Sequence, residues 1–289
     1  MKEYHIPVML DECIKFLNIK ENGVYIDCTL GEAGHSIEIL KRLNNQGILF
    51  SIDRDQEAIE FVKEKYPSEL SHGNWHLVKS NFAYLDKLNI MADGILMDLG
   101  VSSRQIDQKE RGFSYRYSDA DLDMRMDKEL GVTALDLINV LNESQLSKLF
   151  LEYGEERFAR RIASAIKKEN IKNVGDLTSL IYKVVPATTR REDSHHPARR
   201  VFQALRIAVN DELNSIQEGI DNAFKILNSK GRLCIISFHS LEDRIVKNRF
   251  KEIEKNNLGK LIEYIEPTLS EIERNPRSRS AKLRVLEKN

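Results

Sequence analysis

Two glycines and two aspartates are the first residues whose types and spacing suggest chemistry. Gly31 and Gly34 lie between an apolar, β-branched run and a segment with helical apolar spacing, which predicts a strand, a tight turn and a helix start. Glycine there accepts positive φ and lets a ligand approach the helix-opening amides, which favour a carboxylate or phosphate. Asp53 ends the next apolar run, 19 positions after Gly34 (53 minus 34). That offset is typical of an acid that binds ribose hydroxyls, so the pattern predicts a cradle for an adenosine-containing cofactor.

Plainer interpretations of the same residues remain open. The glycines are compatible with an ordinary strand-to-helix turn, and Asp53 is compatible with a cap for the helix that begins at Asp55. His239, which follows the fifth predicted strand, is either a substrate contact or proton acceptor, or a structural histidine.

Two further strand ends extend the predicted site. Phe82 follows the third strand and offers an aromatic face for an adenine, and Asp98 ends the fourth strand. Because ligands of open α/β sheets bind at the carboxyl ends of the strands, we expect Asp27, Asp53, Phe82 and Asp98 to line one crevice.

The elements that must position these residues alternate between strand and helix. Strands are predicted at 23–29, 47–53, 74–81 and 92–99, with helices at 35–43 and 55–66, as in a parallel, doubly wound α/β sheet. After Gly100 the pattern changes to helices, predicted at 133–141, 143–153, 156–169 and 176–185, and Asn142 with Gln145 resembles a capping box. One long amphipathic helix against the sheet is predicted over 201–227, then a strand at 232–240, a helix at 241–255 and strands at 261–266 and 281–287.

This order of elements predicts two domains. Residues 1–104 and 201–289 are assigned to the sheet domain, and residues 105–200 to an inserted, all-helical substrate-recognition domain. The simpler alternative is that the helices only decorate the sheet.

Composition restricts the class of protein. The chain has 289 residues, of which 41% are hydrophobic and 31% charged, as in a soluble globular protein. It contains neither an apolar run of about 18 residues nor a signal-like N-terminus, so we expect a cytoplasmic protein with no membrane contact. Three widely spaced cysteines indicate a reducing compartment and argue against structural zinc, and no metal site is predicted.

A net charge of -1 excludes a generally basic nucleic-acid binder, so any RNA contact must come from local clusters. Two clusters are candidates, with a solvated surface as the alternative for each. The first comprises Arg111, Arg116 and Arg125 beside Tyr115 and Tyr117, and the second comprises Arg190, Arg191, Arg199 and Arg200 around His195-His196-Pro197.

The opening pattern fits both a dinucleotide oxidoreductase and a methyltransferase that uses S-adenosylmethionine. A hydride enzyme needs a site for a second nucleotide half, and no second phosphate-type glycine turn is present in the sequence. A methyltransferase needs mainly to align acceptor, methyl carbon and sulfur, without a metal. If the acceptor is an exocyclic base amine, Asp98 is placed to accept a hydrogen bond from it.

Motifs in register along the whole chain resemble the bacterial 16S ribosomal RNA cytosine-N4 methyltransferase family, also called the MraW family. They are His5-Ile6-Pro7-Val8, Asp27-Cys28-Thr29-Leu30-Gly31 with Gly34-His35-Ser36, Ile52-Asp53-Arg54-Asp55, Asp98-Leu99-Gly100-Val101-Ser102-Ser103, Arg111-Gly112-Phe113-Ser114, Leu122 to Asp127, Phe202 to Asn210, Ser237 to Arg244, and Asn275-Pro276-Arg277 with Ser280 to Arg284.

The resemblance implies a class I, Rossmann-like methyltransferase fold with an inserted helical domain. It also implies an enzyme that uses S-adenosylmethionine to methylate N4 of a cytosine in the 16S rRNA of the small ribosomal subunit. By position, the family's cofactor contacts fall on Ala33, Gly34, His35, Asp53, Phe82, Asp98 and Gln105. The catalytic residue stays open between Asp98 and His239, and a homodimer is left open.

Three positions depart from the family pattern. Ala33 replaces a usual glycine, which restricts φ but is expected to leave its backbone amide available to the cofactor. Arg104 replaces a usual proline, and Ala198-Arg199-Arg200 replaces a usual Ala-Thr-Arg. The alternatives in function are a non-catalytic rRNA-binding assembly factor that retains the cofactor fold, and a small-molecule methyltransferase. The second would leave the insertion and the arginine clusters without a purpose.

Overall fold

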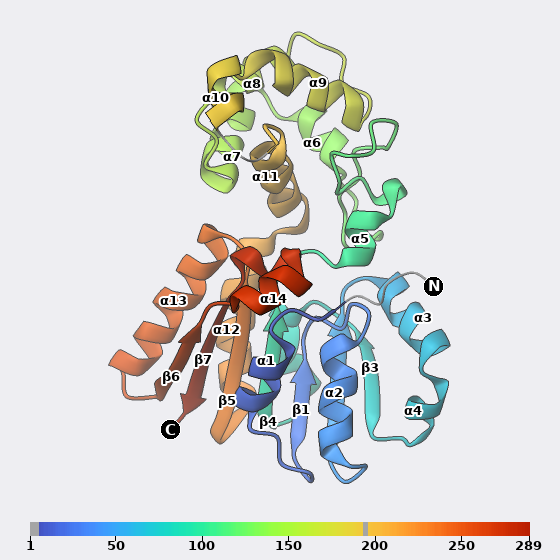
Figure 1. Cartoon of the computed structure of the whole chain (residues 1–289), viewed down its shortest axis with the longest axis vertical. Coiled ribbons are helices and arrows are strands. Elements are labelled where there is room, and N and C mark those ends of the chain that lie inside the picture. The colour runs from blue at the N-terminus through green and yellow to red at the C-terminus, as the bar shows by residue number, and fades with distance from the viewer. Residues whose placement is uncertain (1–5, 193–195) are drawn as a thin grey trace. The chain divides into compact units, whose positions relative to one another are not determined.

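The computed structural model describes residues 6–192 and 196–289 and divides the chain into two compact units (Figure 1). Unit 1 contains the residues up to Gly100 and those from Leu213 onward, and unit 2 runs from Val101 to Glu212. His5 and His195, which the sequence motifs include, lie outside the described residues.

Unit 1 is built on a seven-stranded sheet of order β3-β2-β1-β4-β5-β7-β6. Strands β1 to β5 pair in parallel, and β7 pairs antiparallel with both β5 and β6. The strands are β1 (Val24–Asp27), β2 (Ile48–Asp53), β3 (Trp75–Lys79), β4 (Ala92–Asp98), β5 (Leu227–Ser237), β6 (Gly259–Ile265) and β7 (Lys282–Lys288). Every predicted strand is therefore present.

The helices of unit 1 connect these strands. They are α1 (Leu10–Leu17), α2 (Gly34–Leu43), α3 (Gln56–Lys65), α4 (Pro67–Ser71), η1 (Phe82–Leu88), α12 (Glu212–Ile226, at the boundary of the units), α13 (Ser240–Lys255), α14 (Leu269–Arg274) and η3 (Pro276–Ser280). No helix in residues 6–192 and 196–289 is long and apolar enough to cross a membrane.

Successive side chains of a strand point to opposite faces of the sheet, so each face has a hydrophobic core of its own. Tyr25 and Leu96 pack with α1, α2 and α3, whereas Ile26 and Ile95 pack with α12 and α13. Figure 1 shows α1 and α2 in front of the sheet. Because both faces are covered, the central strands are apolar almost throughout, and their polar residues concentrate at the strand ends.

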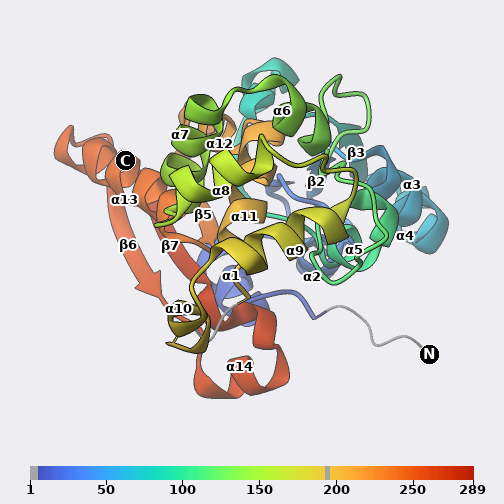
Figure 2. The ribbon, with the colours of Figure 1, turned by 90° about the horizontal axis from the view of Figure 1, so that it is seen from above.

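In the described part of unit 2, every regular element is a helix. These are α5 (Ser103–Asp107), η2 (Lys109–Arg111), α6 (Ala134–Val140), α7 (Glu143–Gly154), α8 (Ala159–Ile166), α9 (Val174–Val184), α10 (Ala187–Glu192) and α11 (Arg199–Asn210). Helix α11 packs against α6 and α7, α7 packs against α8, and α8 packs against α9 (Figure 2). The predicted capping box is confirmed: Asn142 and Gln145 exchange side-chain and backbone hydrogen bonds at the start of α7.

The prediction of one long helix over 201–227 is wrong. The chain leaves helical geometry at Asp211, whose φ of 48° is left-handed, and this residue separates α11 from α12. Helix α11 belongs to unit 2 and contributes Val201, Phe202 and Leu205 to its core. The amphipathic spacing runs on through the break, which is why periodicity alone does not reveal it.

Candidate active site

Two backbone amides of the turn between β1 and α2 donate hydrogen bonds that hold it in place. Gly31 has a φ of 50°, and its amide donates to Oδ2 of Asp53 at 2.9 Å, which ties the end of β1 to the end of β2. Ala33 has a φ of 67°, and its amide donates to the carbonyl of Leu30 at 2.7 Å. The expectation that the amide of Ala33 stays available is therefore wrong, because the turn itself uses that donor.

Gly34 is the first residue of α2. The sequence suggested that a glycine here provides a positive φ, but the structure gives another reason. A Cβ built on Gly34 would lie 2.5 Å from Cγ of Pro7, and Gly34 is not among the glycines with positive φ. The glycine therefore permits the close approach of Pro7. The first turn of a helix is where anionic or polar ligand atoms are commonly bound, because its amides have no intrahelical acceptors.

Gly34→Ala is expected to displace the segment around Pro7 and to weaken cofactor binding, because the new methyl group needs space that the proline ring occupies. We expect the affinity loss to be partly restored in the double variant Gly34→Ala/Pro7→Ala, which removes the nearest ring carbon. Isothermal titration of both proteins with S-adenosylmethionine measures this. Independent, additive losses would show that the contact with Pro7 does not matter.

Asp53 ends β2 and accepts two backbone hydrogen bonds. Oδ1 accepts from the amide of Asp55 and Oδ2 from the amide of Gly31, both at 2.9 Å. The alternative interpretation, in which Asp53 caps the following helix, is wrong. The N-cap of α3 is Asp55, whose side chain accepts a hydrogen bond from the amide of Glu57. Burial raises the pKa of Asp53 to about 6, although both backbone hydrogen bonds lower that pKa. Each carboxylate oxygen accepts more than one hydrogen bond, so ribose hydroxyls can still be bound.

Asp27 has a structural role, contrary to the expectation that it lines the crevice. It is buried, and its Oδ2 accepts from the hydroxyl of Ser36 at 2.6 Å. That hydroxyl lies 2.8 Å from the hydroxyl of Ser51, which accepts from Nε1 of Trp75 at 2.8 Å. This buried network joins β1, α2, β2 and β3, and so fixes the start of α2 against the sheet.

Asp98 ends β4 beside α2. Its amide donates to Oγ1 of Thr29 at 2.8 Å, and its Oδ2 lies 3.9 Å from Nδ1 of His35. His35 is buried and its Nε2 lies 3.1 Å from the carbonyl of Val8, so the ring is held between that carbonyl and Asp98. The sheet thus brings together the predicted residues Asp98 and His35, which are 63 positions apart (98 minus 35).

The carboxylate of Asp98 lies in surroundings that disfavour its charge. Burial, followed by the charges of Asp27 and Glu242, raises its pKa well above the usual range. In the described part of the chain, its Oδ1 is shielded from solvent and has no hydrogen-bond partner. A cationic or hydrogen-donating ligand group would satisfy this oxygen and stabilise the carboxylate form.

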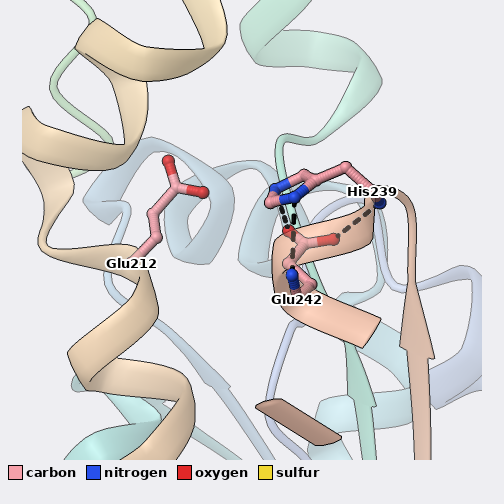
Figure 3. Close-up of side chains that lie close together, drawn as sticks. All are labelled: Glu212, His239 and Glu242. Carbon is pink, nitrogen blue, oxygen red and sulfur yellow. Dashed lines mark hydrogen bonds and ion pairs between the residues drawn. The ribbon is translucent and has the colours of Figure 1, made fainter. Parts of the chain in front are cut away.

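His239 and Glu242 form a pair at the start of α13 (Figure 3). Nε2 of His239 lies 3.0 Å from Oε1 of Glu242, and Nδ1 accepts from the amide of Glu242 at 3.4 Å. Oε2 of the fully buried Glu242 accepts from the amide of Phe238 at 2.7 Å. The geometry therefore gives His239 a structural role as the N-cap of α13.

Phe82 and Gln105 lie in different units. Phe82 begins η1 and packs over Gly219 of α12, because a Cβ at Gly219 would lie 2.5 Å from Cδ2 of Phe82. Its ring stays partly exposed. In unit 2, the buried Gln105 completes a capping box with Ser102 at the start of α5.

Two of the three arginines of the first cluster form hydrogen bonds within the protein. Arg111 is buried and donates to the carbonyls of Arg125 and Met126, at 3.0 and 2.9 Å. Arg125 forms two hydrogen bonds with the carboxylate of Asp123, at 2.7 and 2.8 Å. Of the three arginines in the cluster, only Arg116 is exposed. The expectation that this loop offers three arginines to RNA is therefore wrong for Arg111, and the partly exposed Arg125 is paired with Asp123.

Several residues that shape the site were missed by sequence reasoning. Thr29 bridges the ends of β1 and β4, Ser36 links Asp27 to Ser51, and Glu242 anchors the turn after β5. Only Glu242 had a local signal, since an acid three residues after a cap residue is typical of a capping box. The other two act through partners that are distant in the sequence.

The residues present fit S-adenosylmethionine. Asp53 is placed to bind ribose hydroxyls, the helix-opening amides of α2 can bind a polar group, and the unpartnered oxygen of Asp98 suits an ammonium or an amine. The sheet order and these strand-end residues define a Rossmann-like methyltransferase that uses S-adenosylmethionine.

Comparisons with known proteins identify the family. The profile of the MraW methylase family matches residues 2–289. The chain belongs to the MraW methylase family. It is 47% identical to the ribosomal RNA small subunit methyltransferase H of Halothermothrix orenii, covering 98% of both chains, and 45% identical to the protein of that name from Clostridioides difficile, covering 100% of both.

The fold also has a counterpart among solved structures. The putative rRNA-methylase of Clostridium thermocellum superposes with a TM-score of 0.50 at 9% identity, covering 99% of this chain and 100% of that chain. Because the chain belongs to the MraW methylase family, it is an enzyme that transfers a methyl group, and S-adenosylmethionine is its methyl donor.

Proposed function

We propose that the protein methylates N4 of a cytosine in the 16S rRNA of the small ribosomal subunit. The observation that carries the proposal is the buried, unpartnered Oδ1 of Asp98 at the end of β4, in a chain of the MraW methylase family. The relatives from Halothermothrix orenii and Clostridioides difficile are named as small-subunit rRNA methyltransferases, which supports the substrate class.

The cofactor supplies an activated methyl group when it is bound, so this chain must mainly bind, orient and exclude water. We propose that Asp53 binds the ribose, that the turn at residues 33–35 positions the cofactor, and that Phe82 and Gln105 complete its contacts. Asp98 would hold either the ammonium of the cofactor or the amine of the cytosine. The second role matters because the amine's lone pair is delocalised into the ring, and an acceptor for its proton makes the nitrogen more nucleophilic.

Asp98 is favoured over His239 as the group that contacts the reacting amine. Both ring nitrogens of His239 face Glu242, at 3.0 and 3.4 Å, whereas Oδ1 of Asp98 has no partner among the described residues. A base role for His239 would require the ring to leave the cap of α13.

Labelled methyl transfer tests the proposed function directly. Small subunits from cells that lack the protein should accept a labelled methyl group from S-adenosylmethionine, and nuclease digestion should release the label as N4-methylcytidine. Small subunits from wild-type cells are the matched control, since their site is already modified. No transfer by a folded protein that binds the cofactor would favour the assembly-factor alternative.

We propose that unit 2 contacts the RNA through residues 157–200. This stretch contains eleven lysines and arginines but only four aspartates and glutamates, although the whole chain has a net charge of -1. Arg157 is exposed just before α8, Arg160 and Arg161 are exposed in its first turn, and Arg191 and Arg199 are exposed in α10 and α11. A local concentration of exposed cations favours phosphate contacts despite an acidic remainder.

Replacing Arg190, Arg191, Arg199 and Arg200 with alanine should weaken binding to the small subunit and lower its salt dependence. For single-stranded contacts the log–log salt slope should decrease by up to about 3, because fewer counterions are released. Cofactor affinity should be nearly unchanged. Binding titrations at several salt concentrations measure the slope.

A variant with four exposed lysines of unit 1 replaced by alanine is the matched control, because it loses the same charge elsewhere. These lysines are Lys63, Lys251, Lys255 and Lys260. Equal salt slopes for the arginine variant, the lysine variant and the parent would remove the arginines from the RNA interface.

A further inference from the structure

Four consecutive residues of the N-terminal segment connect the β1–α2 turn with the C-terminal part of unit 1. The first and the last of these four residues, Ile6 and Met9, form hydrogen bonds with residues near the C-terminus. The carbonyl of Ile6 accepts from Nδ2 of Asn275 at 3.0 Å, and the amide of Met9 donates to Oε1 of Glu271 at 2.8 Å. Helix α14, which carries Glu271, lies beside α1 in both views (Figures 1 and 2).

The inner two residues contact the β1–α2 turn. The ring of Pro7 lies where a Cβ of Gly34 would be, and the carbonyl of Val8 lies 3.1 Å from Nε2 of His35. Because residues 6 to 9 are adjacent in the chain, a displacement at either outer residue must move Pro7 and Val8. The segment therefore couples the position of α14 to the position of Gly34 and His35.

Glu271 is built into this arrangement. It is 6% exposed, and its own amide donates to Oγ1 of Thr268, the cap of α14. Met9 is fully buried and has a left-handed φ of 51°, a conformation that is unfavourable for a non-glycine residue. Such a conformation persists only where neighbours fix it, and the buried hydrogen bond from Met9 to Glu271 is one of these constraints.

We propose that Glu271 is a positioning residue for the cofactor. By accepting the amide of Met9, it fixes the carbonyl of Val8, which orients His35 toward Asp98, and it holds Pro7 against the first residue of α2. The inference rests on the proposed role of residues 33–35 in cofactor binding. A role confined to anchoring the N-terminal segment is the competing account.

Three variants separate these accounts. Glu271→Ala leaves the buried amide of Met9 without its acceptor, whereas Glu271→Gln retains an acceptor oxygen at the same position. Glu273→Ala removes an exposed acid of the same helix and is the matched control. We expect Glu271→Ala to raise the dissociation constant and the KM of S-adenosylmethionine by roughly 5- to 20-fold, with kcat at saturating cofactor retained. Glu271→Gln should restore most of the affinity, and Glu273→Ala should match the parent.

Hydrogen exchange without cofactor supplies a readout that does not depend on the proposed function. Amides of residues 34–39 should exchange faster in Glu271→Ala than in the parent, and Glu273→Ala should not differ from the parent. Unchanged exchange in these residues, or a lower melting temperature with unchanged cofactor affinity, would overturn the positioning role. If Glu271→Ala does not fold, Asn275→Ala tests the same coupling from Ile6, with the same criteria. A parent protein that fails to bind S-adenosylmethionine would overturn the proposed function, while the exchange comparison still decides the coupling.

Discussion

Asp98→Asn is expected to lower the rate of methyl transfer by about 100-fold or more, which corresponds to a loss of about 3 kcal/mol of transition-state positioning. Asparagine keeps the size of the side chain and one acceptor oxygen but removes the charge. The unpartnered Oδ1 and the raised pKa of Asp98 indicate a carboxylate that is stabilised mainly by what it binds. A ligand cation or amine would lose that partner in the variant.

The fold should survive this substitution. The contact that joins Asp98 to β1 is made by its backbone amide, which donates to Thr29, and the asparagine retains it. Asp86→Asn, at an exposed position of η1, is the matched control for the loss of one carboxylate. A normal melting temperature with reduced activity would confirm that the effect is local.

Single-turnover rates at saturating S-adenosylmethionine separate the two roles of Asp98. A restored rate would mean that Asp98 only binds the ammonium of the cofactor, and a persistent defect would place it at the amine of the cytosine. A variant with the parent rate at every cofactor concentration would remove Asp98 from the site and return the protein to the assembly-factor alternative.

Asp53→Ala is expected to weaken S-adenosylmethionine binding by about 10- to 150-fold. Hydrogen bonds to a charged group contribute roughly 1.5 to 3 kcal/mol, and the carboxylate is the proposed acceptor for the ribose hydroxyls. The substitution also removes the acceptor for the amide of Gly31, so part of the loss will come from the turn. Asp53→Asn retains one acceptor oxygen and should bind more tightly than Asp53→Ala. Calorimetric affinities equal to that of the parent would refute the ribose assignment.

The pH dependence of binding supplies a second measurement on Asp53. Its pKa in the free protein is raised to about 6, and ribose hydroxyls that donate to the carboxylate favour its ionised form. Affinity should therefore be greatest above pH 6 and decline as the pH falls through about 6, because the carboxylate must then lose a proton before it binds. In Asp53→Asn this decline should disappear. A decline of the same size in the variant would assign the titration to another group.

The sequence by itself determined the order and type of the elements and the outline of the cofactor site. Apolar runs predicted all seven strands, and the signal is strongest in the central strands β1 and β4, which are apolar along most of their length because both faces of the sheet are covered. Asp53 and Asp98 were predictable because they end such runs, and residues at the carboxyl ends of parallel strands meet at one edge of a sheet. These signals need only a residue and its near neighbours in the chain.

The tertiary structure alone decided what several of these residues do. No sequence pattern connects Gly34 with Pro7 or Asp27 with Ser36. The same is true of Met9 and Glu271, a pair that is 262 positions apart in the chain. Exposure also required the structure, since Arg111 is buried among carbonyls while Arg116 is exposed in the same loop. The periodicity of a sequence shows which side chains are apolar. It does not show which distant atom accepts a given hydrogen bond, which side chain packs against a given glycine, or which charged side chain is buried. Those partners are chosen by packing, and packing exists only once the chain has folded.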